Sequence, residues 1–238
     1  MNTLIFLEEC ASTNDEIERY FTLKKSVYFA LYTFNQTKGK GQYGNRWNFS
    51  ANQNLAFSFA IPADSVALPQ EMFNFHTAII VAEFLDRLTK TPVDIKWPND
   101  LIIGNKKVCG ILIEKKNMGQ VPYFIVGVGL NILQTDFQNL PKAGSLLTQT
   151  GLAIDLHQLA NELNVCFTSN LKSAPSSQEI LSTINQRLYR KEKISVFELN
   201  GVRQNGIIKI VDMQGYLWID LENEGLQKFY HKEIQLLY

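Results

Sequence analysis

The chain has 238 residues, a length that suits one large domain or one domain with a small appendage. Its 23 lysines and arginines equal its 23 aspartates and glutamates, so no bulk positive charge favours DNA or an anionic membrane as a partner. The three cysteines are widely spaced and odd in number, no apolar stretch approaches the roughly 20 residues that cross a bilayer, and no signal peptide is apparent, which together favour free thiols in the cytoplasm.

Near the N-terminus a short strand is expected at Thr3–Leu7, and the residues that follow it predict the start of a helix. Thr13 and Glu16 have the spacing of a capping box. A helix N-terminus has free N–H groups, and the side chains of Ser12 and Asn14 add a hydroxyl and an amide beside them. The segment therefore suits the polar head of a ligand, although a plain helix start has the same pattern.

Residues 35–47 read NQTKGKGQYGNRW and combine a flexible backbone with positive charge. The three glycines make the backbone permissive, and Lys38, Lys40 and Arg46 supply cationic groups. Taken alone, the pattern favours a flexible surface loop; the alternative is a loop that orders around a phosphate. The spacing fits neither a P-loop nor a dinucleotide-binding fingerprint, because no GK[ST] follows and no helix begins on it.

The next two elements are expected to be structural. Residues 54–62 alternate large apolar residues with smaller ones, which predicts a half-buried strand. Residues 69–88 have the apolar spacing of a helix that contains His76. A lone histidine of this kind is expected to be structural, and the same expectation applies to His157 and His231, since no cluster of histidine, cysteine and aspartate indicates a metal site.

The stretch 94–114, DIKWPNDLIIGNKKVCGILIE, alternates strand-like and polar segments. Val93–Trp97 predicts a strand that ends at Pro98, because proline has no N–H to donate and restricts the residue before it. Gly104 and Asn105 predict a hairpin turn, since both residues tolerate positive φ. Val108–Glu114 then predicts a returning apolar strand.

Such a hairpin places the corner at residues 96–100 near Lys107. The site would hold the ammonium groups of Lys96 and Lys107, the amide of Asn99 and the carboxylate of Asp100. The lysines and the amide suit a phosphate or a carboxylate, and the aspartate could take a proton from an attacking amine or hold magnesium. The alternative is a solvated turn with ordinary surface lysines, but a tryptophan and a proline fixed between polar groups are unusual in a plain turn.

Downstream, Pro122–Asn131 predicts a strand whose glycines, Gly127 and Gly129, allow close approach of a ligand or of another backbone. A tightly packed core strand is the alternative for this segment. Residues 155–171 and 178–190 have the spacing of amphipathic helices.

After residue 190 the sequence changes character. It contains five short apolar runs separated by turn residues, which predict a small all-β barrel, at residues 194–199, 206–211, 216–221, 226–230 and 234–237. We therefore expect an α+β fold with a catalytic domain at residues 1–190 and a C-terminal domain at residues 191–238.

Several of these motifs together resemble those of the biotin–protein ligases. They are KWPND followed by a lysine seven residues after its aspartate, GILIE, the Ser-Thr-Asn triplet, the glycine-rich segment and GVGLN. The resemblance covers about Leu4 to Leu237. It implies a catalytic domain like that of class II aminoacyl-tRNA synthetases, with a mixed, mostly antiparallel sheet flanked by helices, and an SH3-like C-terminal domain. Because the sequence begins a few residues before the first strand, the expected type is monofunctional, without an N-terminal DNA-binding domain.

The resemblance also implies a set of site residues. Biotin contacts are expected from Ser12, Thr13, Asn14, Gln36, Gly39, Lys40, Gly110, Ile111 and Gly129. Contacts with ATP or the adenylate are expected from Lys40, Gln42, Arg46, Trp47, Lys96, Asn99, Lys107 and Asn131. In catalysis, Lys107 would neutralise the α-phosphate with help from Lys96, and Asp100 would orient or deprotonate the acceptor amine.

Two positions depart from the family pattern. Lys40 stands where bacterial members often have arginine, which keeps the charge. Gln42 stands where most members have a second arginine, and we expect Lys40 or Arg46 to compensate for that missing cation.

The reaction implied by the resemblance joins biotin to a lysine of a biotin carboxyl carrier domain through biotinyl-5′-AMP. ATP and biotin are substrates, Mg²⁺ enters bound to ATP, no nucleic acid or membrane partner is expected, and a homodimer is possible. Two alternatives remain at this stage. One is a lipoate or octanoate ligase of the same fold, and the other is a biotin-binding protein without catalysis.

Overall fold

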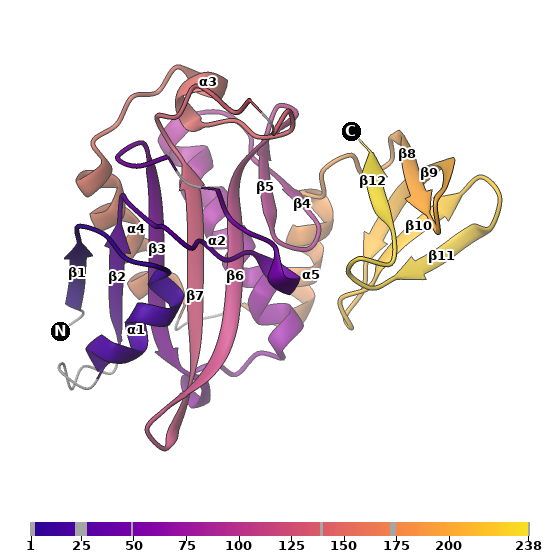
Figure 1. Cartoon of the computed structure of the whole chain (residues 1–238). Coiled ribbons are helices and arrows are strands. Elements are labelled where there is room, and N and C mark those ends of the chain that lie inside the picture. The colour runs from indigo at the N-terminus through magenta and orange to yellow at the C-terminus, as the bar shows by residue number, and fades with distance from the viewer. Residues whose placement is uncertain (1–2, 22–27, 49, 139, 172–174, 238) are drawn as a thin grey trace.

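The computed structural model describes residues 3–21, 28–48, 50–138, 140–171 and 175–237. Its larger sheet has seven strands in the order β1-β2-β3-β7-β6-β5-β4 (Figure 1). The strands are β1 (Thr3–Leu7), β2 (Phe29–Thr33), β3 (Asn54–Pro62), β4 (Asp94–Lys96), β5 (Asp100–Ile103), β6 (Lys106–Met118) and β7 (Val121–Asn131). Only β1 and β2 pair in parallel among them, so the expected mixed, mostly antiparallel sheet is confirmed.

Helices cover both faces of this sheet. On one face lies α1 (Thr13–Phe21), and on the other lie α2 (Gln70–Thr89), α4 (Leu156–Asn170) and α5 (Ser177–Gln186) (Figure 1). The short elements α3 (Leu146–Thr150), η1 (Gln42–Gly44) and η2 (Ala63–Ser65) lie in connections. Strand β3 is buried along its whole length rather than half-buried as predicted. The reason is tertiary: α1 covers the face that the alternation left for solvent.

Two other local expectations change in the structure. Helix α1 begins at Thr13, but the Thr13 hydroxyl bonds Gln36 and Ser58 instead of forming the predicted capping box. The last predicted helix ends at Gln186, four residues early. Beyond it, the Arg187 carbonyl accepts from the Ile95 N–H at 2.7 Å, so the chain there pairs with the edge strand β4.

The C-terminal segment forms a second, antiparallel sheet in the order β11-β10-β9-β8-β12. Its strands are β8 (Ile194–Leu199), β9 (Val202–Val211), β10 (Leu217–Leu221), β11 (Gly225–Phe229) and β12 (Gln235–Leu237). All five predicted runs lie in strands, but β9 begins at Val202, four residues before the predicted start, because Asn205 and Gly206 belong to the strand instead of a turn. Asn200, Gly201, Gly215 and Gly225 have positive φ at the turns, as their residue types indicated.

The two sheets share buried contacts. The side-chain amide of Asn185 in α5 donates to the Val211 carbonyl at 2.9 Å and accepts from its N–H at 2.7 Å. One apolar cluster continues from α2 and α5 to Phe197 and Ile208 of the small sheet. The division at residue 190 therefore stays a proposal. Among the described residues, no helix is long and apolar enough to span a membrane.

Candidate functional site

The floor of a cavity on the α1 face is made of small residues. In β3 and β7, alternate positions point large side chains toward α2 and leave Ala56, Ser58, Gly127 and Gly129 on the other face, and β6 adds Gly110 next to the larger Leu112. A Cβ at Gly127 would lie 2.4 Å from Asn14 Oδ1, and one at Gly129 would lie 2.6 Å from Trp47 Cε2. A Cβ at Gly110 would lie 2.8 Å from Trp47 Cζ3. Glycine is therefore required here so that other side chains can lie directly on the strands.

At one end of the cavity the Ser-Thr-Asn triplet is buried and hydrogen-bonded. The Ser58 hydroxyl donates to Asn14 Oδ1 at 2.6 Å, and Asn14 Nδ2 donates to Glu114 Oε2 at 2.7 Å. The N–H of Thr13 donates to Gln36 Oε1 at 2.9 Å. These partners fix the orientation of the polar groups before any ligand arrives, which is the arrangement expected of a recognition site.

At the other end lies the corner between β4 and β5. Lys107 Nζ is 2.6 Å from Asp100 Oδ1, so the hairpin brings these two groups together as the spacing predicted. Asn99 is held against β6, because its side-chain amide donates to the Ile111 carbonyl and its own carbonyl accepts from the Ile111 N–H at 3.1 Å. Burial lowers the pKa of Lys96, and Asp100 opposes that shift. The corner is thus a compact site of mixed charge.

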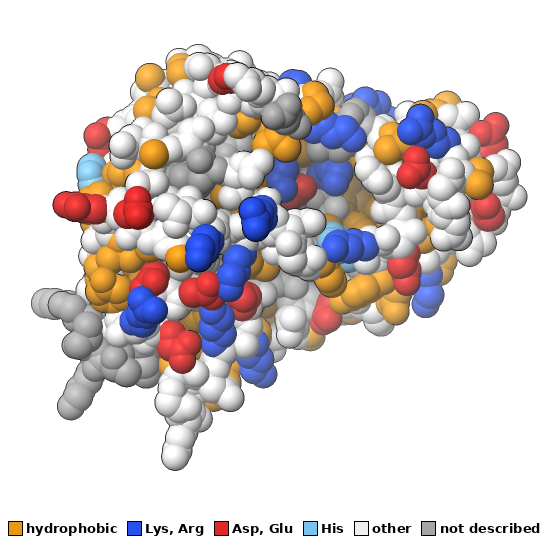
Figure 2. Space-filling model, in the orientation of Figure 1, with side chains coloured by type: hydrophobic (Ala, Val, Ile, Leu, Met, Phe, Trp, Pro, Cys, Tyr) orange, Lys and Arg blue, Asp and Glu red, His pale blue; other side chains and the backbone are white. Residues whose placement is uncertain are grey.

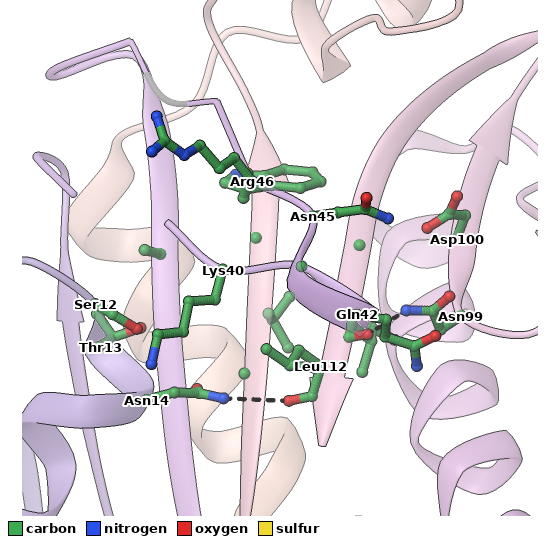
Figure 3. Close-up of a pocket in the computed structure, with 18 of the residues that line it drawn as sticks. Ser12, Thr13, Asn14, Lys40, Gln42, Asn45, Arg46, Asn99, Asp100 and Leu112 are labelled. Carbon is green, nitrogen blue, oxygen red and sulfur yellow. Dashed lines mark hydrogen bonds between the residues drawn. The ribbon is translucent and has the colours of Figure 1, made fainter. Parts of the chain in front are cut away.

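Residues 39–47, here called the Gly-rich loop, cross over the cavity (Figure 3). The loop is a small hairpin in which the Gly41 N–H donates to the Asn45 carbonyl at 2.7 Å and the Trp47 N–H donates to the Gly39 carbonyl at 3.0 Å. The Trp47 indole lies on the floor glycines, with Lys107 Nζ 5.3 Å from its ring centre. The buried Trp47 Nε1 and Gln42 Oε1 have no hydrogen-bond partner among the described residues.

The cations of the loop lie apart from Gln42. Lys40 Nζ is 2.6 Å from Asp15 Oδ2, at the triplet end of the cavity, and Figure 3 shows Lys40 and Arg46 extending away from Gln42. Partial burial opposes ionisation of Asp15, but hydrogen bonds from Lys40 and Lys116 hold its pKa below the ordinary value. Compensation for Gln42 by Lys40 or Arg46 stays a prediction, and it would require one of these side chains to turn toward Gln42.

The structure gathers most of the predicted site residues in one cavity. Its lining includes Ser12, Thr13, Asn14, Gln36, Lys40, Gln42, Arg46, Trp47, Asn99, Asp100, Lys107, Gly110, Ile111 and Gly129.

Four predicted residues lie outside this cavity or turn their side chains away from it. Lys96 lines a neighbouring cleft, and Gly39 lines an outer hollow beside the Gly-rich loop. The side chain of Ile111 is 3% exposed and lies in the core on the α2 side, because strand alternation leaves only its backbone at the cavity. Asn131 is outside the cavity lining, and its side-chain amide donates to the Gly144 carbonyl at 3.0 Å.

Sequence reasoning missed several lining residues. Ala56 belongs to the floor and could have been found from the alternation of small and large residues in β3, and Leu112 of β6 also lines the cavity. Asn45 lies within the Gly-rich loop. His231 was expected to be structural but lines the cavity from the small sheet, and nothing in its sequence context indicated this.

Comparison with known proteins gives a consistent result. The model of the biotin/lipoate A/B protein ligase family matches residues 11–131. The bifunctional ligase/repressor BirA of Bacillus subtilis is 26% identical over 209 residues, covering 84% of this chain and 64% of that protein. The biotin–[acetyl-CoA-carboxylase] ligase of Mycobacterium tuberculosis is 29% identical over 132 residues, covering 54% of this chain and 48% of that protein. The chain thus spans less than two thirds of the length of these curated relatives.

Among solved structures, the biotin protein ligase of Aquifex aeolicus in complex with biotin and ATP superposes with a TM-score of 0.81. It is 26% identical, and the match covers 99% of this chain and 98% of that one. The fold with its two sheets is therefore that of the biotin protein ligases.

Proposed function

The chain belongs to the biotin/lipoate A/B protein ligase family, and from this premise we propose that it is a biotin–protein ligase. Its substrates would be biotin and ATP, and its product would be biotin joined to one lysine of a carrier domain. The observation that carries the proposal is a single cavity that has the Ser-Thr-Asn triplet at one end and the Lys107–Asp100 pair at the other. A ligand with a polar ring and a distant carboxylate fits such a cavity.

In the first step, the biotin carboxylate would attack the α-phosphorus of ATP, and the bond to pyrophosphate would break. Negative charge builds on the α-phosphate in this step, and Lys107, which lines the cavity beside Asp100, would stabilise it. Lys96 lines the adjoining cleft, where it would attract the departing pyrophosphate. Mg²⁺ would enter with ATP and neutralise the triphosphate, and Asp100 is the carboxylate it would meet among the described lining residues.

In the second step, the ε-amine of the carrier lysine would attack the carbonyl of the mixed anhydride, and AMP would leave. Asp100 would orient this amine and accept its proton. Asp100 is paired with Lys107 at 2.6 Å, so the adenylate would draw Lys107 toward phosphate and release the carboxylate for the amine.

The Gly-rich loop must move during this cycle. The Trp47 indole lies against the two floor glycines where a ligand would pass, so binding has to displace it. The loop would then wrap the adenylate and exclude water, which protects the reactive anhydride from hydrolysis.

The acceptor would be the carrier domain of a biotin-dependent carboxylase, in line with the names of the relatives. We propose a cytoplasmic location on the ground that Cys10, Cys109 and Cys166 are all free and buried. Association of the chain into a homodimer stays a hypothesis, and no nucleic acid or membrane partner is proposed.

The test is a two-step assay with the purified chain, ATP, Mg²⁺ and biotin. Pyrophosphate release should depend on biotin, and a recombinant carrier domain should gain one biotin on its acceptor lysine, as mass spectrometry would show. A carrier with arginine at that lysine is the matched control and should stay unlabelled.

Competition with lipoate and octanoate separates the alternatives. Neither acid should slow biotin transfer at concentrations equal to biotin. Preferred transfer of lipoate to a lipoyl domain would instead show a lipoate ligase, and calorimetric biotin binding without pyrophosphate release would show a binding protein without catalysis.

A further inference from the structure

His231 reaches the site from the opposite end of the chain. It lies in the connection between β11 and β12 of the small sheet, far beyond the residues 11–131 that the family model covers. It lines the main cavity, the cleft between the two sheets and a small hollow beside Trp97. His231 therefore stands where these three spaces meet, next to the corner that holds Asp100.

Two aromatic rings hold the His231 imidazole in place. The Tyr43 ring of the Gly-rich loop stacks on it with centres 4.6 Å apart and planes 20° apart, and the Trp97 ring lies 5.8 Å away. Both residues are hydrogen-bonded to loops of the small sheet, Tyr43 through its backbone and Trp97 through its ring. Lys232 Nζ donates to the Tyr43 carbonyl at 3.2 Å, and Trp97 Nε1 donates to the Gly215 carbonyl at 3.0 Å. The imidazole is thus oriented before a ligand binds.

The Nδ1 atom of this ring is buried and has no hydrogen-bond partner among the described residues. Buried polar atoms are almost always paired in native proteins, so such an atom needs a cause. The other two atoms with the same property, Gln42 Oε1 and Trp47 Nε1, also belong to residues of the cavity lining. All three residues therefore border a space that a ligand can fill.

The charges around His231 indicate what kind of ligand this is. The cavities that it lines are bordered by more cations than carboxylates, and Figure 2 shows lysine and arginine side chains around the hollow between the two parts of the molecule. The charged groups that line these spaces are Lys40, Arg46, Lys96, Lys107, Lys142, Lys232, Asp100 and Glu71. An anion is the ligand that such a surface accepts, and an imidazole N–H is a suitable donor to its oxygen.

We propose that His231 is a nucleotide-binding residue whose imidazole donates a hydrogen bond to a phosphate oxygen of ATP. This inference rests on the proposed function and extends it, because it makes the small sheet part of the ATP site. It also gives the stacked Tyr43 a role: the small sheet holds the Gly-rich loop at the point where the loop must close on the nucleotide.

The proposal has a consequence for pH. In the free protein, burial and then the charge of Lys96 lower the pKa of His231, while Asp100 raises it, so the ring is mostly neutral at pH 7. A bound phosphate favours the protonated ring and raises that pKa. ATP affinity should therefore gain a contribution that is present at low pH and is lost as the pH rises through the pKa of the bound form.

The direct test follows the histidine ring protons by NMR in the whole chain, which has three histidines. The pH titration is recorded for the chain alone, for the chain with inorganic pyrophosphate, and for the chain with ATP in the absence of biotin. The variants His76→Phe and His157→Phe assign the histidine signals. The pKa of His231 should rise by about one unit when ATP binds, which corresponds to about a tenfold difference in ATP affinity between the protonated and neutral ring. The pKa values of the other two histidines should stay unchanged. An unchanged His231 titration at saturating ATP overturns the proposal.

The affinity test uses His231→Phe, which keeps a ring for stacking but removes both nitrogens. Its dissociation constant for ATP should exceed that of the unmodified chain by about tenfold at pH 6 and by less at pH 8, and comparing the two chains at each pH cancels the titration of ATP itself. His157→Phe is the matched control and should match the unmodified chain. His231→Asn keeps a hydrogen-bond donor that does not titrate. It should therefore bind ATP more tightly than His231→Phe, and this difference in affinity should not grow at low pH.

The outcomes also separate this proposal from the one it rests on. If the chain forms biotinyl-AMP while His231→Phe binds ATP as the unmodified chain does at both pH values, the role of His231 is wrong and the ligase assignment stands. If the unmodified chain binds neither biotin nor ATP, both are wrong. Should His231→Phe fail to fold, the NMR titration of the unmodified chain and the His231→Asn comparison decide.

Discussion

The floor of the cavity and the Gly-rich loop above it differ in how their polar groups are satisfied. On the floor side, Asn14 bonds both Ser58 and Glu114, and the strands beneath are paired along their length. In the loop, Gln42 and Trp47 each bury a polar atom that has no partner among the described residues. The floor is therefore complete without a ligand, whereas the loop is not.

This difference indicates how much of the ligand's binding energy each region would take up in becoming ordered. A preorganised floor recognises the ligand without rearranging, which is the less costly way to bind. A loop with unpaired groups and three glycines gains its partners only when a ligand arrives, and ordering it takes up part of the binding energy. Substitutions in the two regions should therefore differ in what they change.

The largest expected effect comes from the floor strand β6. Lys107→Ala should slow pyrophosphate release on the order of 10²–10³-fold, because it removes the cation at the α-phosphate and leaves Asp100 without its partner. Lys106→Ala is the matched control, since the Lys106 ammonium contacts the Pro141 carbonyl instead of the cavity. A Lys107→Ala chain that retains more than a tenth of the rate would contradict the assigned role.

The next effect compares a floor glycine with a loop glycine. Gly127→Ala places a Cβ 2.4 Å from Asn14 Oδ1, so Asn14 must move and lose Ser58. We expect about 1–3 kcal/mol lower unfolding free energy in urea and weaker biotin binding by calorimetry.

The matched loop substitution is Gly41→Ala. Gly41 has φ −113°, and its Cβ would lie an ordinary 3.4 Å from the Asn45 side chain. Gly41→Ala should leave biotin binding intact. Its unfolding free energy should be unchanged or up to about 0.4–1 kcal/mol higher. Equal losses in both variants would show that the loop is as rigid as the floor.

A smaller effect is expected when the missing cation is restored. Gln42→Arg should tighten ATP binding by roughly tenfold in calorimetry, since one charged hydrogen bond to phosphate contributes about that much. Gln42→Leu serves as the control: it removes the unpaired Oε1, so it should not lower stability and should not tighten ATP binding. No gain with arginine would mean that another cation already serves this position once the loop has closed.

The smallest expected effect is at Cys10, where we expect the chain to stay fixed while the Gly-rich loop moves. Cys10 lies at its base, where the Cys10 N–H donates to the Asn35 carbonyl at 3.1 Å and the Cys10 carbonyl accepts from Thr37 at 2.9 Å. Burial first, and then the neighbouring carboxylates, raise the pKa of the Cys10 thiol to about 12, so little thiolate forms at pH 8.

Iodoacetamide should therefore leave Cys10 unlabelled at pH 8, with or without biotin and ATP, as peptide mass spectrometry would show. The same reagent in urea should label all three cysteines. Labelling of Cys10 that appears when ligands bind would place the moving segment further toward the N-terminus than residue 39.

The sequence by itself determined the features that depend on short spacing. A two-residue turn at Gly104 and Asn105 pairs Ile102 with Lys107 and so brings Asp100 close to Lys107, although a bulge after Leu101 that the sequence did not indicate shifts the register at Asp100. The five strands of the small sheet followed in the same way from regular turn residues. The family motifs in turn indicated most of the cavity lining.

Only the tertiary structure decided which distant side chains meet. It paired Lys40 with Asp15, turned Asn131 to Gly144, laid Trp47 on the floor glycines and brought His231 to the corner. Turn and strand geometry is set by neighbours in the chain, so a sequence shows it directly. Contacts between separate elements depend on how whole sheets and loops pack, and no local pattern in the chain records that arrangement.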